Sequence, residues 1–142
     1  MTALRHQYLT ILKGQYWHFF EEGQVGPEAV VVLMESADRA LDHEETPIED
    51  WGFLKTYIIS TSFLNILRWL SQVPFMGSIF RRYLFDHFSL AYDIIVNFIE
   101  AHEATRPMFM DVNKSNERGE SIMKEAEGQA KLAEVYMHSN IE

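Results

Sequence analysis

Residues 27–43 read "PEAVVVLMESADRALDH", and their apolar pattern indicates the fold class. Pro27 follows a glycine and suits the first position of a helix, where its missing N–H is not needed. Further along, apolar residues recur at helical spacing, while most charged residues fall elsewhere on the helix. The expected apolar stripe consists of Val30, Val31, Met34, Ala37 and Leu41. The stretch therefore predicts an amphipathic helix that packs one face against a core.

Helical patterns also flank this stretch on both sides. Upstream, a helix is expected over residues 3–22, with Gly23 ending it in the left-handed conformation. Downstream, Thr46-Pro47 breaks the pattern, and Asp50 is placed to cap a third helix that ends near residue 70. The third helix is apolar nearly all the way round, which predicts a central, buried position.

Two more helices are expected in the C-terminal half. The fourth covers residues 78–104, the stretch "TRPMFMDVNKSNERGE" after it indicates a turn or weak order, and a last helix over 116–138 carries a thin apolar stripe. We therefore predict an all-α fold, a compact bundle of about five helices with a long fourth helix. Residues 1–110 are expected to form the helical core domain, and residues 111–142 a linker plus a C-terminal acidic amphipathic helix.

Composition excludes several classes of protein. The chain has 142 residues, of which 47% are hydrophobic and 13% aromatic, enough for one domain with a core. It has no cysteine, which excludes disulfides, thiol catalysis and cysteine-ligated zinc. The net charge of -9 argues against nucleic acid as a partner. The N-terminal residues show no signal peptide pattern.

The charge is uneven along the chain. Residues 1–50 carry a balance of -7, residues 51–100 of +1, and residues 101–142 of -3. The middle third is also the most apolar, and its stretch 53–70 is the best candidate for a membrane span. Because that stretch contains Lys55, Asn65 and Arg68, we interpret it as a buried helix and predict no transmembrane segment in this chain.

The motif "GQYWHFFEEGQ" at residues 14–24 raises the question of a metal or ligand site. His18, Glu21 and Glu22 share one side of a helix, but no histidine has a glutamate three residues before it, as di-iron sites require. We predict no metal site and interpret the motif as a helix end. Its aromatic residues Tyr16, Trp17, Phe19 and Phe20 are expected to pack inward, with His18 and the glutamates in solvent.

The sequence also lacks the usual patterns of catalysis. It contains no Gly-x-Ser-x-Gly turn, no Gly-x-Gly-x-x-Gly and no phosphate-binding loop. The pairs at His43-Glu44 and His102-Glu103 are adjacent rather than on one helical face, and are expected at helix ends and on the surface. We therefore predict that the chain is not an enzyme and holds no cofactor.

Basic and aromatic residues alternate around the loop between the third and fourth helices. Arg68, Trp69, Arg81 and Arg82 form the basic part of this cluster and are candidates for contact with a partner or with anionic lipid. The alternative is that the aromatic residues belong to the core while the arginines pair with the acidic first half. The sequence leaves both interpretations open.

Three stretches together resemble a known family. They are "LTILKGQYWHFFEEGQVGPEAVVVLMESADRALDH" at 9–43, "FSLAYDIIVNFIEAHEA" at 88–104 and "SIMKEAEGQAKLAEVYM" at 121–137. Their order and spacing resemble the cytoplasmic region of plasma-membrane sodium/proton exchangers of the plant salt-overly-sensitive type, related to sperm-specific exchangers. In that family the region follows the transmembrane antiporter domain and leads into a cyclic-nucleotide-binding-like domain, and neither domain is within this sequence. Residues 53–87 are too short for the voltage-sensor insert of sperm-type members.

The resemblance implies a non-catalytic regulatory and coupling domain of a homodimeric sodium/proton antiporter, on the cytoplasmic side of the plasma membrane. Its implied partners are the transmembrane exchanger and the downstream nucleotide-binding-like domain. It gives a structural role to the junction of the first two helices, at Tyr16, Trp17, Glu21 and Glu22, and makes the last helix a lever. Two alternatives remain: a free-standing helical adaptor that binds a partner helix, and a small-ligand binder that uses the aromatic cluster.

Overall fold

The computed structural model describes residues 2–58, 77–113 and 116–140. All regular secondary structure in these ranges is α-helical, as predicted. The helices are α1 (Thr2–Glu21), α2 (Pro27–Asp42), α3 (Asp50–Ile58), α5 (Gly77–Val112) and α6 (Glu117–Asn140). The fourth of them, α5, is the longest, with 36 residues. None of the described helices is both long and apolar enough to cross a membrane.

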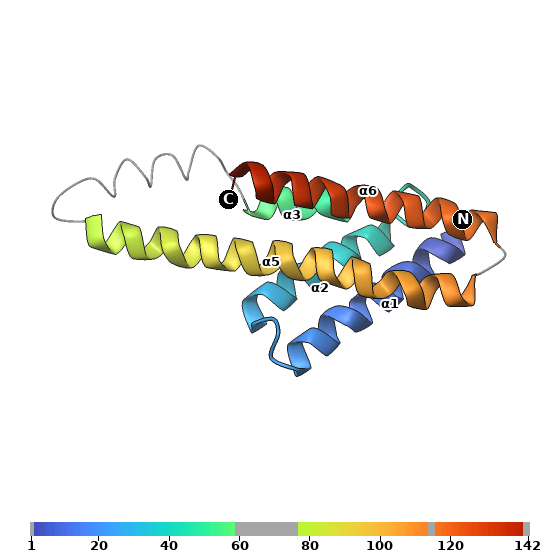
Figure 1. Cartoon of the computed structure of the whole chain (residues 1–142), viewed down its shortest axis with the longest axis horizontal. Coiled ribbons are helices and arrows are strands. Elements are labelled where there is room, and N and C mark those ends of the chain that lie inside the picture. Colours follow the sequence, from blue (N-terminus) through green and yellow to red (C-terminus); the bar gives the residue numbers. More distant parts are fainter. Residues whose placement is uncertain (1, 59–76, 114–115, 141–142) are drawn as a thin grey trace.

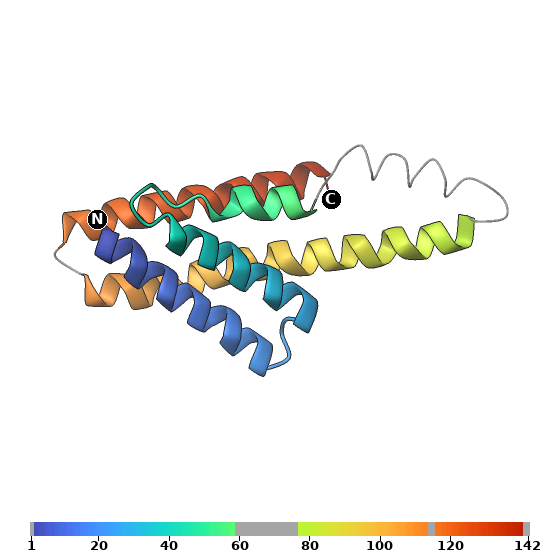
Figure 2. The same ribbon diagram turned by 180° about the vertical axis from the view of Figure 1, so that it is seen from behind.

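The helices pack in two directions around one core. Helices α5 and α6 lie side by side along the long axis of the molecule, and α3 lies beside α6 (Figure 1). Helices α1 and α2 form an antiparallel pair that crosses α5 obliquely and packs against it, as the view from behind also shows (Figure 2). Every helix contributes to the core, and α6 adds Ile122, Met123, Ala126 and Ala133.

The corner between α1 and α2 follows the prediction. Gly23 has a φ of 78°, in the left-handed region where a side chain would be strained, and Gln24 N donates to the Phe19 carbonyl at 2.8 Å. Pro27 begins α2, as its fixed φ favours. The corner packs on α5, because Gln24 Nε2 donates to Asn97 Oδ1 at 3.2 Å. The motif at residues 14–24 is therefore a helix end that is held against α5.

The buried face of α2 differs from the predicted stripe at one position. Val30 and Ala37 are buried as expected, but Val31 is 65% exposed, and Val32 and Leu33 point inward instead. The helix packs on α1 and α5 on one side and on α3 on another. The inward arc therefore spans several adjacent helix positions and is centred away from Val31.

The end of the long fourth helix was predicted too early. Helix α5 does not stop near residue 104 but continues through Pro107 to Val112. Proline lacks the N–H that an inner turn requires and crowds the preceding turn. Packing overrides this cost, because Thr105 and Phe109 on either side of the proline are fully buried, and Phe109 meets the ring of Tyr8 at 5.4 Å edge to face.

The described part of the third helix is less buried than predicted. Leu54 is fully buried and Trp51 is 3% exposed, but Tyr57 is half exposed. The apolar face of α3 therefore covers the core from one side only. The rest of the predicted third helix, up to residue 70, lies outside the described residues.

Candidate functional site

A chain of three buried polar side chains links α1, α3 and α5. The Tyr8 hydroxyl lies 2.5 Å from His102 Nδ1, and His102 Nε2 lies 2.8 Å from Asp50 Oδ2. Tyr8 and Asp50 are at most 1% exposed and His102 is 4% exposed. Sequence analysis placed His102 on the surface, and this was wrong. The histidine lies on the buried side of α5, where Phe98 packs edge to face on its ring at 4.5 Å.

The protonation pattern of this chain follows from Tyr8. Burial raises the pKa of the Tyr8 hydroxyl well above its usual range, and the negative charge of Asp50 raises it further. Tyr8 therefore stays protonated at neutral pH, and its hydroxyl shares a hydrogen bond with His102 Nδ1. Because the Asp50 carboxylate can only accept, the bond between the other ring nitrogen and Asp50 is donated by the His102 Nε2–H.

The arrangement resembles a histidine held by an acid, but it does not have the geometry of a catalytic site. Tyr8 and Asp50 occupy both ring nitrogens of His102, which leaves neither free to activate a nucleophile. The Tyr8 side chain is fully buried beneath a cleft between α5 and α6, which it lines together with His102. The chain instead cross-links three helices that are far apart in sequence.

Sequence analysis expected the Asp50 side chain to cap α3, and this was wrong. Its Oδ2 atom accepts the bond from His102, and its Oδ1 atom has no hydrogen-bond partner among the described residues. The carboxylate is tolerated because it lies in the first turn of α3, where the helix dipole favours negative charge. The first turn is completed from another helix, since Trp51 N donates to Gln129 Oε1 of α6 at 3.2 Å.

A second buried cross-link joins α1 to α6. Arg5 donates from Nη2 to Glu125 Oε1 at 2.7 Å and from Nε to Oε2 at 3.0 Å, a two-point pair. The hydrogen bond to Glu125 raises the pKa of Arg5 above its ordinary value. Glu125 Oε2 also accepts from Ile48 N at 3.3 Å, and Arg5 Nη1 reaches the Glu44 carbonyl at 3.4 Å. The pair thereby fixes the loop between α2 and α3 as well.

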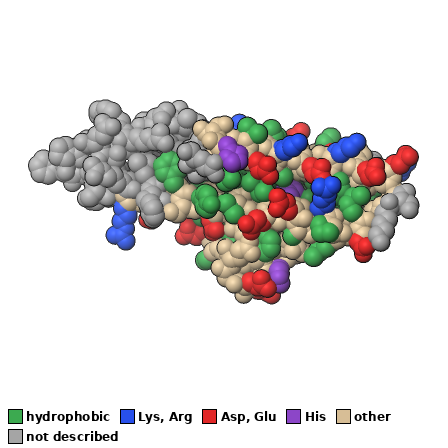
Figure 3. Space-filling model, viewed as in Figure 1, with side chains coloured by type: hydrophobic (Ala, Val, Ile, Leu, Met, Phe, Trp, Pro, Cys, Tyr) green, Lys and Arg blue, Asp and Glu red, His purple; other side chains and the backbone are tan. Residues whose placement is uncertain are grey.

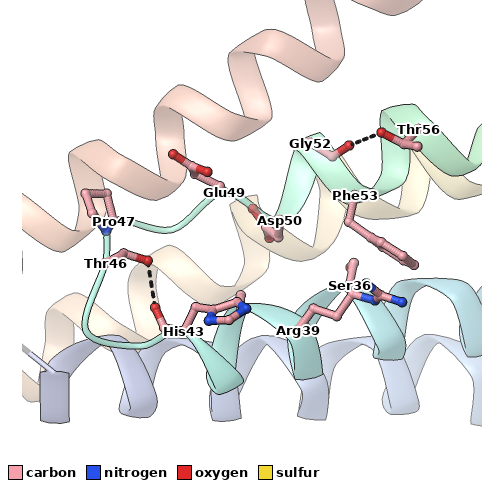
Figure 4. A pocket seen from close by; sticks show the side chains of 11 residues that line it. Ser36, Arg39, His43, Thr46, Pro47, Glu49, Asp50, Gly52, Phe53 and Thr56 are labelled. Atoms are coloured by element: carbon pink, nitrogen blue, oxygen red, sulfur yellow. Dashed lines mark hydrogen bonds between the residues drawn. The ribbon is translucent and has the colours of Figure 1, made fainter.

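A groove of about 450 Å³ opens between α2 and α3. Figure 4 shows Arg39 of α2 and His43, directly after that helix, on one wall and Phe53 of α3 on the other, with the loop at Pro47 closing one end. The Arg39 guanidinium carbon lies 4.4 Å from the centre of the Phe53 ring, a cation–π contact across the groove. The Asp50 side chain is sealed beneath it, so the groove does not expose the buried carboxylate.

A smaller cleft of about 330 Å³ runs between α5 and α6. Arg106 of α5 pairs with Glu127 of α6 at 3.0 Å across it. On this face of the molecule charged side chains of both signs alternate with apolar ones (Figure 3). Within the part of the chain that the structure describes, no group of histidine and acidic side chains is placed to hold a metal ion.

The residues predicted for the helix junction separate into two environments. Tyr16 is fully buried, whereas Glu21 and Glu22 are exposed, and Glu22 pairs with His18 at 3.2 Å. Trp17 was expected to pack inward, and this was wrong, because its side chain is 49% exposed. Trp17 lies on the outer side of α1, directly after Tyr16, which faces the core.

The predicted basic cluster is described only in part. Arg68 and Trp69 lie outside the described residues, and Arg81 is in the part of α5 whose side chains are not described. Arg82 is exposed on α5. The proposed contact of this cluster with lipid or a partner therefore stays a prediction.

Sequence analysis missed the polar cross-links, although one signal for His102 was present. The apolar stripe of α5 includes Ala91, Ile95 and Phe98, and the same spacing continues through His102, Thr105 and Phe109. A polar residue on a buried stripe requires a partner. The identity of that partner, Asp50, could not be read from spacing, because it lies on another helix.

Comparison with known proteins gives one informative match. No family model matches the sequence. The chain is 25% identical over 134 residues to Sodium/hydrogen exchanger 7 of Arabidopsis thaliana. The match covers 94% of this chain but 11% of that protein, so the chain spans about a tenth of the length of its relative. The similarity supports a relationship to the sodium/proton exchangers, which are transporters rather than enzymes.

Proposed function

We propose that this chain is a non-catalytic coupling and regulatory domain of a sodium/proton antiporter, on the cytoplasmic side of the plasma membrane. The observation that carries the proposal is the extent of the match, which runs along 94% of the chain and falls within one short part of a much longer exchanger. A segment of that kind is a module of the larger protein. Its partners are then the transmembrane exchanger and a downstream cyclic-nucleotide-binding-like domain.

The buried polar cross-links make the domain suited to transmitting a displacement from one end to the other. The Tyr8–His102–Asp50 chain and the Arg5–Glu125 pair tie α1, α3, α5 and α6 together through directional bonds that leave little room for sliding. A body of this kind moves as a unit when one end is displaced. Helix α6 joins the core through one face and ends at Asn140, and it is the element we assign as the lever toward the downstream domain.

The proposal is tested by exchanging segments in the Arabidopsis relative. The matched segment of that exchanger is replaced by this chain, and sodium-driven proton flux is measured in membrane vesicles. Deletion of the segment should change the flux or its regulation, and this chain should restore it. An unrelated helical bundle of similar length serves as the control for a simple spacer.

Two results would contradict the proposal. Flux that is unchanged by the deletion would favour a free-standing adaptor, which has no place in the transport cycle. Equal restoration by the unrelated bundle would show that only length matters. Immunoblots of the membranes must show equal amounts of each exchanger, so that lost flux is not lost protein.

A further inference from the structure

An apolar patch lies on the outer side of the α1–α2 pair. We name it the Trp17 patch, and it consists of Trp17, Phe20, Val31 and Met34. Trp17 is 49% exposed and Val31 is 65% exposed, while Phe20 and Met34 are partly buried and join the patch to the core. The Trp17 and Phe20 rings lie 5.3 Å apart, so they present one continuous aromatic surface.

The register between the two helices places these residues together. Lys13 of α1 hydrogen-bonds Asp38 of α2, and His6 of α1 reaches Glu44 at 2.9 Å, which sets the antiparallel pairing. Trp17 is one turn beyond Lys13 along α1, and Met34 is one turn before Asp38 along α2. Phe20 and Val31 continue the same seam toward the corner. Figure 2 shows the two helices side by side over this length.

The patch has the features of a contact surface. A half-exposed tryptophan beside a strongly exposed valine leaves apolar area in water, and tryptophan is among the residues that dominate binding energy at interfaces.

The charges around the patch decide which partner fits. The acidic side chains on the exposed positions of α2 and at the end of α1 are Glu21, Glu28, Glu35, Asp38 and Asp42. Of the lysine and arginine side chains on α1 and α2, Arg5 is buried against Glu125, and Lys13 and Arg39 are already paired with Asp38 and Glu35. An acidic rim repels a second copy of the same face and an anionic membrane surface, and it attracts a basic partner.

We propose that the Trp17 patch is the docking site of a basic amphipathic α-helix from a protein partner. The apolar stripe of that helix would lie along the seam between α1 and α2, and its lysine or arginine side chains would reach the acidic rim. The patch and its acidic rim together select such a partner, because a bound helix must offer apolar contact and positive charge at the same time. The proposal stands whether or not the chain belongs to an antiporter.

A designed leucine–lysine amphipathic helix is the probe, with binding to the full chain followed by fluorescence anisotropy. Two peptides control for charge and pattern: one with the same composition in scrambled order, and a leucine–glutamate helix. We expect the leucine–lysine helix to bind more tightly than either. Trp17→Ala should weaken it by about tenfold or more, as for a central interface residue.

Matched variants separate the patch from general acidity. Leu132 and Val135 on α6 are exposed to a similar degree, at 53% and 64%, and the variant Leu132→Ala/Val135→Ala should bind within about twofold of wild type. Glu21→Lys/Glu28→Lys should weaken binding and reduce its dependence on salt. Circular dichroism of each variant confirms that the helices are retained.

Three outcomes would overturn the proposal. Equal loss in the α6 variant, or equal binding of the scrambled peptide, would show attraction to negative charge in general. Trp17-dependent dimerisation in analytical ultracentrifugation would make a second copy the occupant. Trp17-dependent binding to phosphatidylserine vesicles would show that a membrane surface is the occupant of the Trp17 patch.

Discussion

His102 of α5 donates from Nε2 to Asp50 Oδ2 of α3 across 2.8 Å, and the two residues are 52 positions apart in the chain. Both side chains are buried, at 3% and 0% exposure. This bond joins the start of α3 to the middle of the longest helix. It also gives the Asp50 carboxylate its only hydrogen bond from a described side chain, so the stability of the fold depends on it.

Removing His102 should destabilise the domain strongly. His102→Leu leaves the Asp50 carboxylate buried without a donor and the Tyr8 hydroxyl without its hydrogen-bond partner, and we expect a loss of about 3 kcal/mol in the free energy of unfolding. Urea denaturation followed by circular dichroism measures it. Glu103→Gln, on the exposed adjacent position, should change the value by less than about 0.5 kcal/mol. Equal effects of the two variants would remove the structural role of the bond.

Alkaline pH should weaken the fold through its buried tyrosines. Burial raises the pKa of Tyr8, Tyr16 and Tyr136, with the charge of Asp50 adding to the shift of the first two. A raised folded-state pKa means that the folded protein holds protons which the unfolded chain releases. The stability that these protonated tyrosines contribute is complete below the ordinary tyrosine pKa of about 10, and it is lost as the pH rises toward the raised pKa of the folded state.

The tyrosine variants make this expectation specific. The unfolding free energy should fall above pH 10 by up to about 1.4 kcal/mol per pH unit for each buried tyrosine. Tyr16→Phe should reduce that slope and cost little at neutral pH, because the Tyr16 hydroxyl has no hydrogen-bond partner among the described residues. Urea titrations at a series of pH values give the slope directly, and a slope unaffected by Tyr16→Phe would contradict the assignment.

The Arg5–Glu125 pair should show strong energetic coupling. Arg5→Met leaves Glu125 mostly buried with a single backbone donor, and Glu125→Leu leaves the Arg5 guanidinium 8% exposed without its carboxylate. Each single change should cost about 2 kcal/mol, and the double change less than their sum. The exposed pair Arg39–Glu35 is the reference and should give a coupling below about 0.5 kcal/mol. Additive losses at Arg5 and Glu125 would mean that the pair contributes through packing alone.

Two glycines should respond in opposite directions to the same change. Gly23→Ala forces a side chain into the left-handed region at a φ of 78° and should cost about 1 kcal/mol. Gly14→Ala, inside α1 with open space around it, should stabilise the domain by up to about 1 kcal/mol. Thermal unfolding of the two variants beside wild type measures both shifts. A gain at Gly23 would show that the corner relaxes into another conformation.

Local patterns predicted the helices of this chain well. The thin apolar stripe expected on the last helix lies on the buried side of α6, where Ile122, Ala126 and Ala133 are fully buried, and Gly23 with Pro27 predicted where α1 ends and α2 begins. These signals are local because helical spacing and terminal residues act within a few positions of the chain. The all-α class was therefore available from the sequence.

Where local patterns gave the wrong prediction, packing against other helices determined the structure. Helix α5 continues through Pro107 because Thr105 and Phe109 are buried against other helices, a gain that no local propensity reports. Trp17 and Val31 face outward because the arc of each helix that meets its neighbours is centred on other residues. Periodicity indicates that a helix has an apolar side, but the neighbours determine which edge of that side is covered.

The sequence by itself determined that the chain forms helices, where most of them begin and end, and that its first half is acidic. Only the tertiary structure decided that Asp50 meets His102, that Arg5 meets Glu125, and that an apolar patch stays open on the acidic side. The physical reason is distance along the chain. A buried polar group must find its partner wherever the fold brings one, and a surface is defined by what the other helices leave uncovered.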